Sequence, residues 1–113
     1  MRLRLECIGG PHVGESVELP GTLVLGSDPS SSKSSTFFAV SKDSNASAAH
    51  AKLVLQRSRP KKSAILMVRV YDLKSENGTF VNDKRLAKGS FRQAFRNGKI
   101  QVGDSIFCVV KSD

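Results

Sequence analysis

The stretch Asp72-Leu-Lys-Ser-Glu-Asn-Gly-Thr-Phe-Val-Asn82 decides how this sequence folds. It begins where a run rich in β-forming residues, 65–71, ends, and it contains a second apolar run at residues 79–81. Between the two runs, Asn77-Gly78 provides two residues that tolerate a positive φ, as a tight hairpin turn requires. These features by themselves predict a strand, a tight turn and a second strand.

Short apolar runs separated by turn residues continue on both sides of this stretch. The runs with strand character are residues 1–8, 15–19, 22–25, 37–40, 50–56, 100–102 and 105–110. Nine Gly and four Pro interrupt the chain at short intervals. This organisation predicts an all-β fold, an antiparallel sandwich or barrel. Only residues 90–95 also fit a short helix, and the Ser-rich segment 27–47 is expected to be a flexible loop.

The alternating faces of these runs predict the core. The expected core residues are Leu3, Leu5, Leu25, Leu53, Leu55, Val68, Val70, Phe80, Ile106 and Val110. Cys7 and Cys108 fall in the first and last strands, where we expect them to be buried small hydrophobic residues. Two cysteines do not make a disulfide scaffold, and they fit a reduced, intracellular protein.

The charge of the chain is basic and unevenly distributed. Eighteen Lys and Arg against ten Asp and Glu give a formal charge of +8, and the excess lies entirely after residue 56. It collects in residues 57–62, interpreted as a solvated hairpin tip, and in residues 84–99. Such asymmetry indicates an acidic partner, either phosphorylated protein, nucleic acid or an acidic protein surface. The longest apolar run, residues 64–68, is too short to span a membrane, so no membrane partner is expected.

The stretch 72–82 strongly resembles the core signature of the forkhead-associated (FHA) domain. Three further blocks resemble that family in the same order: residues 23–26, residues 47–50 and residues 97–103. The resemblance implies an antiparallel β-sandwich of about eleven strands. It implies that residues 1–113 form a single FHA-like domain, as a fragment of a longer scaffold protein. It also implies that loops at one end bind phosphothreonine peptides and that no reaction is catalysed.

The resemblance assigns roles to individual residues. The implied phosphopeptide-binding positions are Ser27, Ser47 and Asn77, and the implied structural positions are Gly26, His50, Gly78 and Asn82. We expect His50 to hold the recognition loops together by hydrogen bonds. The other histidine, His12, follows Gly-Gly-Pro and is expected to be a surface residue. No zinc-ligand spacing, P-loop or dinucleotide fingerprint is present, so neither a metal nor a cofactor is expected.

The sequence departs from the family at the positions that bind phosphate. Ser27 stands where the family has an Arg, and Glu76 stands where a Thr or Lys often precedes Asn77. A hydrogen bond to a charged group contributes roughly 1.5–3 kcal/mol. Losing the Arg therefore predicts phosphopeptide binding that is weaker by about one to two orders of magnitude, or lost. The residues nearest in sequence that could compensate are Lys42, Lys33 and Lys74.

Two further classes of function stay open. One is a phosphate-independent scaffold or self-association domain that uses a face or an edge of the sandwich. The other is nucleic-acid binding through the basic second half, for which the sequence lacks Trp and an interleaved pattern of aromatic and basic residues. Within the family, the basic segment 57–62 and the chain's start close to its first strand are similar to nibrin-type domains of DNA-repair scaffolds. That similarity implies a nuclear location.

Overall fold

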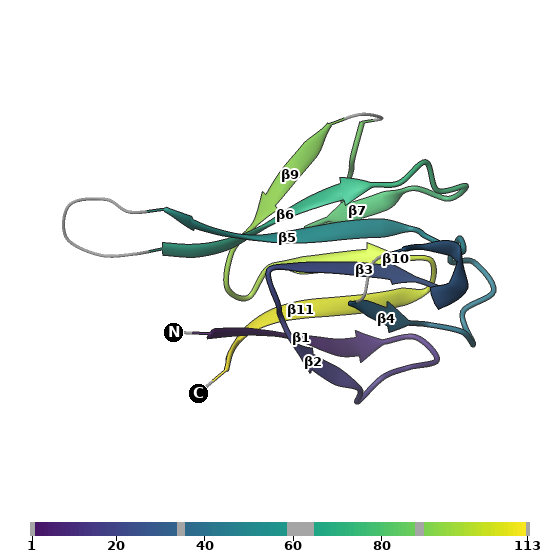
Figure 1. Cartoon of the computed structure of the whole chain (residues 1–113), viewed down its shortest axis with the longest axis horizontal. Helices are drawn as coiled ribbons and strands as arrows, with labels where there is room; N and C mark the ends of the chain where they lie inside the picture. Colours follow the sequence, from purple (N-terminus) through teal and green to yellow (C-terminus); the bar gives the residue numbers. More distant parts are fainter. Residues whose placement is uncertain (1, 34–35, 59–64, 88–89, 113) are drawn as a thin grey trace.

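The computed structural model describes residues 2–33, 36–58, 65–87 and 90–112 (Figure 1). Within these ranges the chain forms strands and one short 3₁₀ turn. The strands are β1 (Arg2–Gly9), β2 (Ser16–Glu18), β3 (Thr22–Gly26), β4 (Phe37–Ala39), β5 (Ala51–Ser58), β6 (Ile65–Asp72), β7 (Thr79–Val81), β8 (Lys84–Arg85), β9 (Phe91–Ala94), β10 (Lys99–Val102) and β11 (Ser105–Ser112), and the turn is η1 (Pro29–Ser31). The all-β prediction is confirmed.

The strands form two sheets. The first has the order β2-β1-β11-β10-β7-β8, and the second has the order β4-β3-β5-β6-β9. Neighbouring strands pair antiparallel, with the exception of β3 and β4, which pair in parallel. The predicted antiparallel sandwich is therefore confirmed, with one exception: β3 pairs in parallel with β4, which lies inside the Ser-rich segment 27–47. Both termini and the β5–β6 hairpin lie at one end of the molecule (Figure 1).

Residues 90–95, which also fit a short helix, contain no helix. Residues 91–94 form the edge strand β9, in which Arg92 is opposite Val70 and Ala94 is opposite Val68 of β6. Pairing with a neighbouring strand here overrides the local pattern. The short strand β8 was not predicted at all. It follows a tight turn in which Asn82 and Asp83 both have positive φ.

The core lies between the sheets and includes most of the predicted residues. Leu3, Leu5, Leu25, Leu53, Val68 and Val70 are buried, and Leu55 packs against them while half-buried. Three predictions are wrong, because Phe80, Ile106 and Val110 face outward and are half-buried. Their neighbours Val81, Phe107 and Val109 are buried instead. A shift of one position moves every side chain of a strand to the other face.

The two thiols lie on adjacent strands but on opposite faces. In β1 and β11, Cys7 is opposite Phe107 while Cys108 is opposite Glu6. Cys7 is buried as predicted, and burial raises the pKa of its thiol. Cys108 is half-buried, and both cysteines are free.

Two adjacent valines test the faces of β11. Val109 is fully buried and Val110 is half-buried. We expect Val109→Ala to lower the free energy of unfolding by about 2 kcal/mol, because it removes buried methyl groups and leaves a cavity. Val110→Ala should lower the free energy of unfolding by well under half of that amount. Urea unfolding measures both values, and equal losses would contradict this assignment of faces.

Candidate functional site at the loop end of the sandwich

Three loop segments, residues 27–33, 40–50 and 73–78, meet at the end of the sandwich opposite the termini (Figure 1). Backbone hydrogen bonds join the first segment to the second. The Ser27 N–H donates to the Ser47 carbonyl at 3.1 Å, and the Asp28 N–H donates to the Ala48 carbonyl at 3.2 Å. The predicted positions Ser27 and Ser47 are therefore neighbours in space.

His50 joins the second segment to the third. Its side chain is fully buried, and its Nδ1 accepts from the Ser47 N–H at 3.0 Å. Because Nδ1 is an acceptor, the neutral imidazole carries its proton on Nε2. Nε2 then donates to the Gly78 carbonyl at 2.8 Å. One buried ring thus fixes the distance between two loops.

The polar groups of Ser47 and Asn77 add two further links. The Ser47 hydroxyl oxygen accepts from the Glu76 N–H at 3.1 Å. The Asn77 amide donates to the Asn45 carbonyl at 3.0 Å. Ser27, Ser47 and Asn77 are thus brought to one end of the sandwich, while each retains polar atoms for a ligand.

The lysines predicted to compensate for the missing Arg are exposed. Lys42 lies at the start of the second segment, and Lys74 lies in the third with a positive φ. Lys33 lies after η1. Among the interactions of the described residues, none joins these ammonium groups to Ser47 or Asn77.

Two exposed carboxylates lie in the three loop segments. Glu76 is exposed, and its N–H contacts the Ser47 hydroxyl. Asp28 caps η1 by accepting from the Ser30 hydroxyl at 2.7 Å and from the Ser30 N–H at 3.0 Å. Both hydrogen bonds lower the pKa of Asp28, and the bond from the Ser30 hydroxyl has the larger effect. The carboxyl group therefore stays ionised. The sequence analysis identified Glu76 and missed Asp28, although Asp-Pro-Ser is a typical start of a helical turn.

The signature 72–82 owes its residues to a local hydrogen-bond network. The Asp72 carboxylate accepts from the hydroxyls of Ser75 and Thr79, the latter at 2.8 Å. The Gly78 N–H donates to the Ser75 hydroxyl at 3.0 Å. These bonds close the loop and satisfy Thr79, which is fully buried. Asn82 ends the signature, and its amide oxygen accepts from the Lys99 N–H at 2.9 Å.

A buried carboxylate that the sequence analysis missed anchors the second segment. Asp43 is 2% exposed and accepts from the Asn45 N–H, the Asp104 N–H and the Ser105 hydroxyl at 3.0, 2.9 and 2.6 Å. Asp43 lies in the polar turn Lys-Asp-Ser-Asn, so the sequence alone indicates that it is exposed. Two of the three donors that make burial tolerable come from Asp104 and Ser105, at the start of β11.

The prediction that His12 is a surface residue is wrong. His12 is 5% exposed, and its Nε2 accepts from the Lys42 N–H at 3.0 Å. Its Nδ1–H donates to the Glu15 carboxylate at 2.8 Å. His12 is far from the second segment in the sequence, and its ring holds the Lys42 end of that segment. Both histidines serve as acceptors for the backbone of this one segment.

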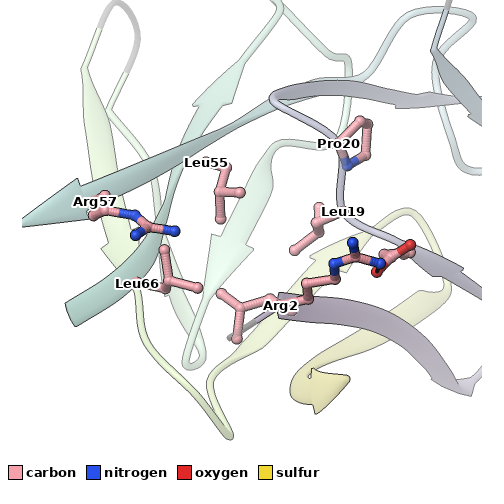
Figure 2. A pocket seen from close by; sticks show the side chains of 8 residues that line it. Arg2, Leu19, Pro20, Leu55, Arg57 and Leu66 are labelled. Carbon is pink, nitrogen blue, oxygen red and sulfur yellow. Dashed lines mark hydrogen bonds and ion pairs between the residues drawn. The ribbon is translucent and has the colours of Figure 1, made fainter. Parts of the chain in front are cut away.

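A cavity of about 590 Å³ lies at the opposite end of the sandwich (Figure 2). Leu55 and Leu66 approach it from β5 and β6, and Leu19 approaches it from the segment after β2. Arg2 and Arg57 also line it, and Arg2 pairs with Glu18 at 3.3 Å. The cavity therefore combines apolar walls with two guanidinium groups.

The described residues contain no group of three or more His, Cys, Asp or Glu side chains arranged to hold a metal ion. They also contain no helix with the length and hydrophobicity that crossing a membrane requires.

A sequence model of the FHA domain family matches residues 23–105 of this chain. The match contains all three loop segments and the signature 72–82. The chain therefore belongs to the FHA domain family, as the sequence analysis predicted. A comparison with curated protein sequences finds no match.

Solved FHA domains share the fold of this chain. The FHA domain of the CT664 protein from Chlamydia trachomatis is 23% identical, with a TM-score of 0.74 over 100% of both chains. The Schizosaccharomyces pombe Nbs1 FHA/BRCT-repeat structure is 23% identical, with a TM-score of 0.76 over 97% of this chain and 35% of that one. The yeast Dun1 FHA domain, in complex with a doubly phosphorylated peptide, is 21% identical, with a TM-score of 0.71 over 99% of this chain and 77% of that one.

Two glycines test how tightly the loop segments are packed. A Cβ on Gly26 would lie 2.1 Å from the Ala48 carbonyl oxygen, whereas a Cβ on Gly21 would meet nothing within 4 Å. We expect Gly26→Ala to lower the free energy of unfolding by about 3 kcal/mol or more, because backbone atoms must move. Gly21→Ala should leave it unchanged or slightly raised. Thermal unfolding compares the two, and a tolerated Gly26→Ala would contradict the close approach of these loops.

Proposed function

We propose that this FHA domain is a non-catalytic protein–protein interaction module whose phosphothreonine recognition is weaker than is usual in its family. FHA domains bind phosphothreonine peptides, and the Dun1 FHA domain was solved with such a peptide. The observation that carries the proposal is that Ser27 lies beside Ser47. The resemblance to the family matches Ser27 with the position of an Arg. A serine hydroxyl offers one donor and no charge, whereas a guanidinium offers five donors and a positive charge.

The charges of the loop end support a weakened site. Asp28 follows Ser27 in the sequence, and the Glu76 N–H donates to the Ser47 hydroxyl. Both carboxylates therefore lie near the contact between Ser27 and Ser47. A phosphothreonine carries nearly two negative charges, so these carboxylates oppose its binding. Lys42 and Lys74 supply the compensating positive charge in this proposal, but flexible ammonium groups replace the planar fork that binds phosphate with two parallel bonds.

The proposed setting is a nuclear scaffold protein of which these residues form the interaction domain. The basic charge of +8 favours acidic or phosphorylated partners. The fold that the chain shares with the S. pombe Nbs1 FHA/BRCT-repeat structure agrees with this setting.

A second candidate function is phosphate-independent binding of a protein segment, including a second copy of this chain. The observation that favours it is the cavity at the end opposite the loops, where Leu55 and Leu66 line a volume of about 590 Å³ (Figure 2). Apolar cavities with a few polar groups at their edges are typical binding sites. Arg57 adds a positive charge there that would favour an acidic segment with an apolar side chain.

Restoring the missing Arg tests the first proposal. We expect Ser27→Arg to raise the affinity for phosphothreonine peptides by about ten- to one-hundredfold, because one charge-assisted contact is regained. Ser112→Arg, at the opposite end of the molecule, adds the same charge and serves as the control. Fluorescence titration of a phosphothreonine peptide library and of its unphosphorylated twin measures the change. Equal affinities of the two libraries for every variant would refute phosphate recognition at this end.

A pair of variants separates the two candidate functions. Ser47→Ala should weaken a phosphate-dependent partner at least several-fold and leave a phosphate-independent one unchanged. Leu55→Lys, which places a charge in the cavity at the far end, should have the opposite effect. Calorimetry with peptides selected from each library measures both, after thermal unfolding has shown that the variants fold. A partner that responds to neither variant would exclude both surfaces.

A further inference from the structure

The outer face of the second sheet brings together basic and aromatic residues that are distant in the sequence. In the strand register, Tyr71 of β6 is opposite Lys52 of β5 on one side and opposite Phe91 of β9 on the other. Arg69, two positions before Tyr71, is on the same face and is opposite Gln93. Their neighbours Leu53, Val68 and Val70 point into the core.

Ring contacts hold the positive groups of this face in place. The Arg69 guanidinium carbon lies 4.6 Å from the ring centre of Phe91, and the Lys52 ammonium lies 5.3 Å from that of Tyr71. The two rings are 5.5 Å apart. A cation over a ring face is attracted by it, so the rings orient these charges without neutralising them. A guanidinium that lies flat over a ring still presents the donors at its edge.

Next to these rings, the same face has a hollow of about 250 Å³. Its lining residues are Gln56, Arg57, Met67, Arg69 and Gln93. Two Arg and two Gln residues thus line the hollow, with no carboxylate among the lining residues, and Arg57 also lines the cavity beside Leu55 and Leu66. Within the described ranges, neither Arg57 nor Arg69 has a carboxylate within 4.0 Å, since the ion pairs there involve Arg2 and His12.

One donor in the hollow lacks a partner. The Nε of Arg69 is buried and makes no hydrogen bond with any described residue. A buried donor without an acceptor costs free energy, more so when the group is charged. A ligand oxygen would remove that cost.

We propose that this hollow is a second anion-binding site, which takes an oxyanion carried by a partner protein. The shared chemistry is that of a carboxylate or a phosphate, both of which match the fork of donors on Arg69. A nucleic acid fits less well, because Tyr71 and Phe91 already have cations over their rings. The volume accommodates one or two anionic groups.

The hollow is separate from the loop end. Gln56, Arg57 and Met67 lie toward the β5–β6 hairpin, whereas residues 73–78 follow the other end of β6 (Figure 1). The proposal therefore does not depend on phosphothreonine binding at Ser47. A partner with two acidic groups could occupy both ends.

Titration with inorganic phosphate tests the site, with nuclear magnetic resonance as the readout. In the unmodified domain, we expect the Arg69 Nε–H and the amides of residues 56, 67 and 93 to shift together and saturably. Arg69→Gln should weaken that binding at least tenfold, whereas Arg92→Gln, which removes the same charge from the exposed edge of β9, should not. Arg69→Lys keeps the charge and removes the fork, so it should also weaken binding. Absence of saturable shifts, or equal loss in Arg69→Gln and Arg92→Gln, would overturn the proposal.

The source of the oxyanion is tested with three probes at one salt concentration: a glutamate-rich peptide, the same peptide with phosphoserine, and a single-stranded oligonucleotide of equal charge. We expect one or both peptides to bind in a manner that depends on Arg69, and the oligonucleotide to bind more weakly. The peptide that binds more tightly identifies the carboxylate or the phosphate as the source. Tighter, Arg69-dependent binding of the oligonucleotide would overturn the assignment to a protein partner.

Discussion

The buried imidazole of His50 is the interaction on which the loop end depends. It accepts from the Ser47 N–H and donates to the Gly78 carbonyl, so the loop between β4 and β5 and the loop between β6 and β7 are held at a fixed separation. Because the ring is fully buried, its two nitrogens depend on these partners and not on water. His12 holds the Lys42 end of the same segment in a similar manner. The geometry of the loops is thus maintained by residues that need no ligand.

Because of this independence, an intact family signature does not by itself establish a phosphate site. Asp72, Ser75, Gly78 and Thr79 satisfy one another's hydrogen bonds, and Gly26 is required by the close approach of the Ala48 carbonyl. None of these roles involves a peptide. Among the predicted phosphate positions, Ser47 and Asn77 also hold the loops together, whereas Ser27 does so only through its backbone. A change of the Ser27 side chain therefore leaves these contacts intact. A matching signature is therefore stronger evidence for the fold than for the ligand.

The sequence predicted most strands because their two faces differ clearly, as in β1, where Leu3 and Leu5 alternate with charged residues. It predicted the wrong faces for β7 and β11, since Thr79 and Ser105 are polar residues whose burial depends on the carboxylates of Asp72 and Asp43. The strand β9 was missed because its pairing with β6 is a long-range contact. Burial of Asp43 and His12 escaped prediction for the same reason, since their partners come from other parts of the chain.

The arrangement of charge also depends on pairing between strands that are distant in the sequence. Read along the chain, Lys52, Tyr71 and Phe91 are isolated and show no basic–aromatic pattern. Pairing of β5, β6 and β9 places them in one row and creates that pattern across the sheet. The loop segments 27–33, 40–50 and 73–78, by contrast, carry the exposed carboxylates of Asp28 and Glu76 and contain no Arg of their own. A domain with a charge of +8 has therefore placed a group of ordered cations on a rigid sheet face, where preorganisation reduces the entropic cost of binding an acidic partner.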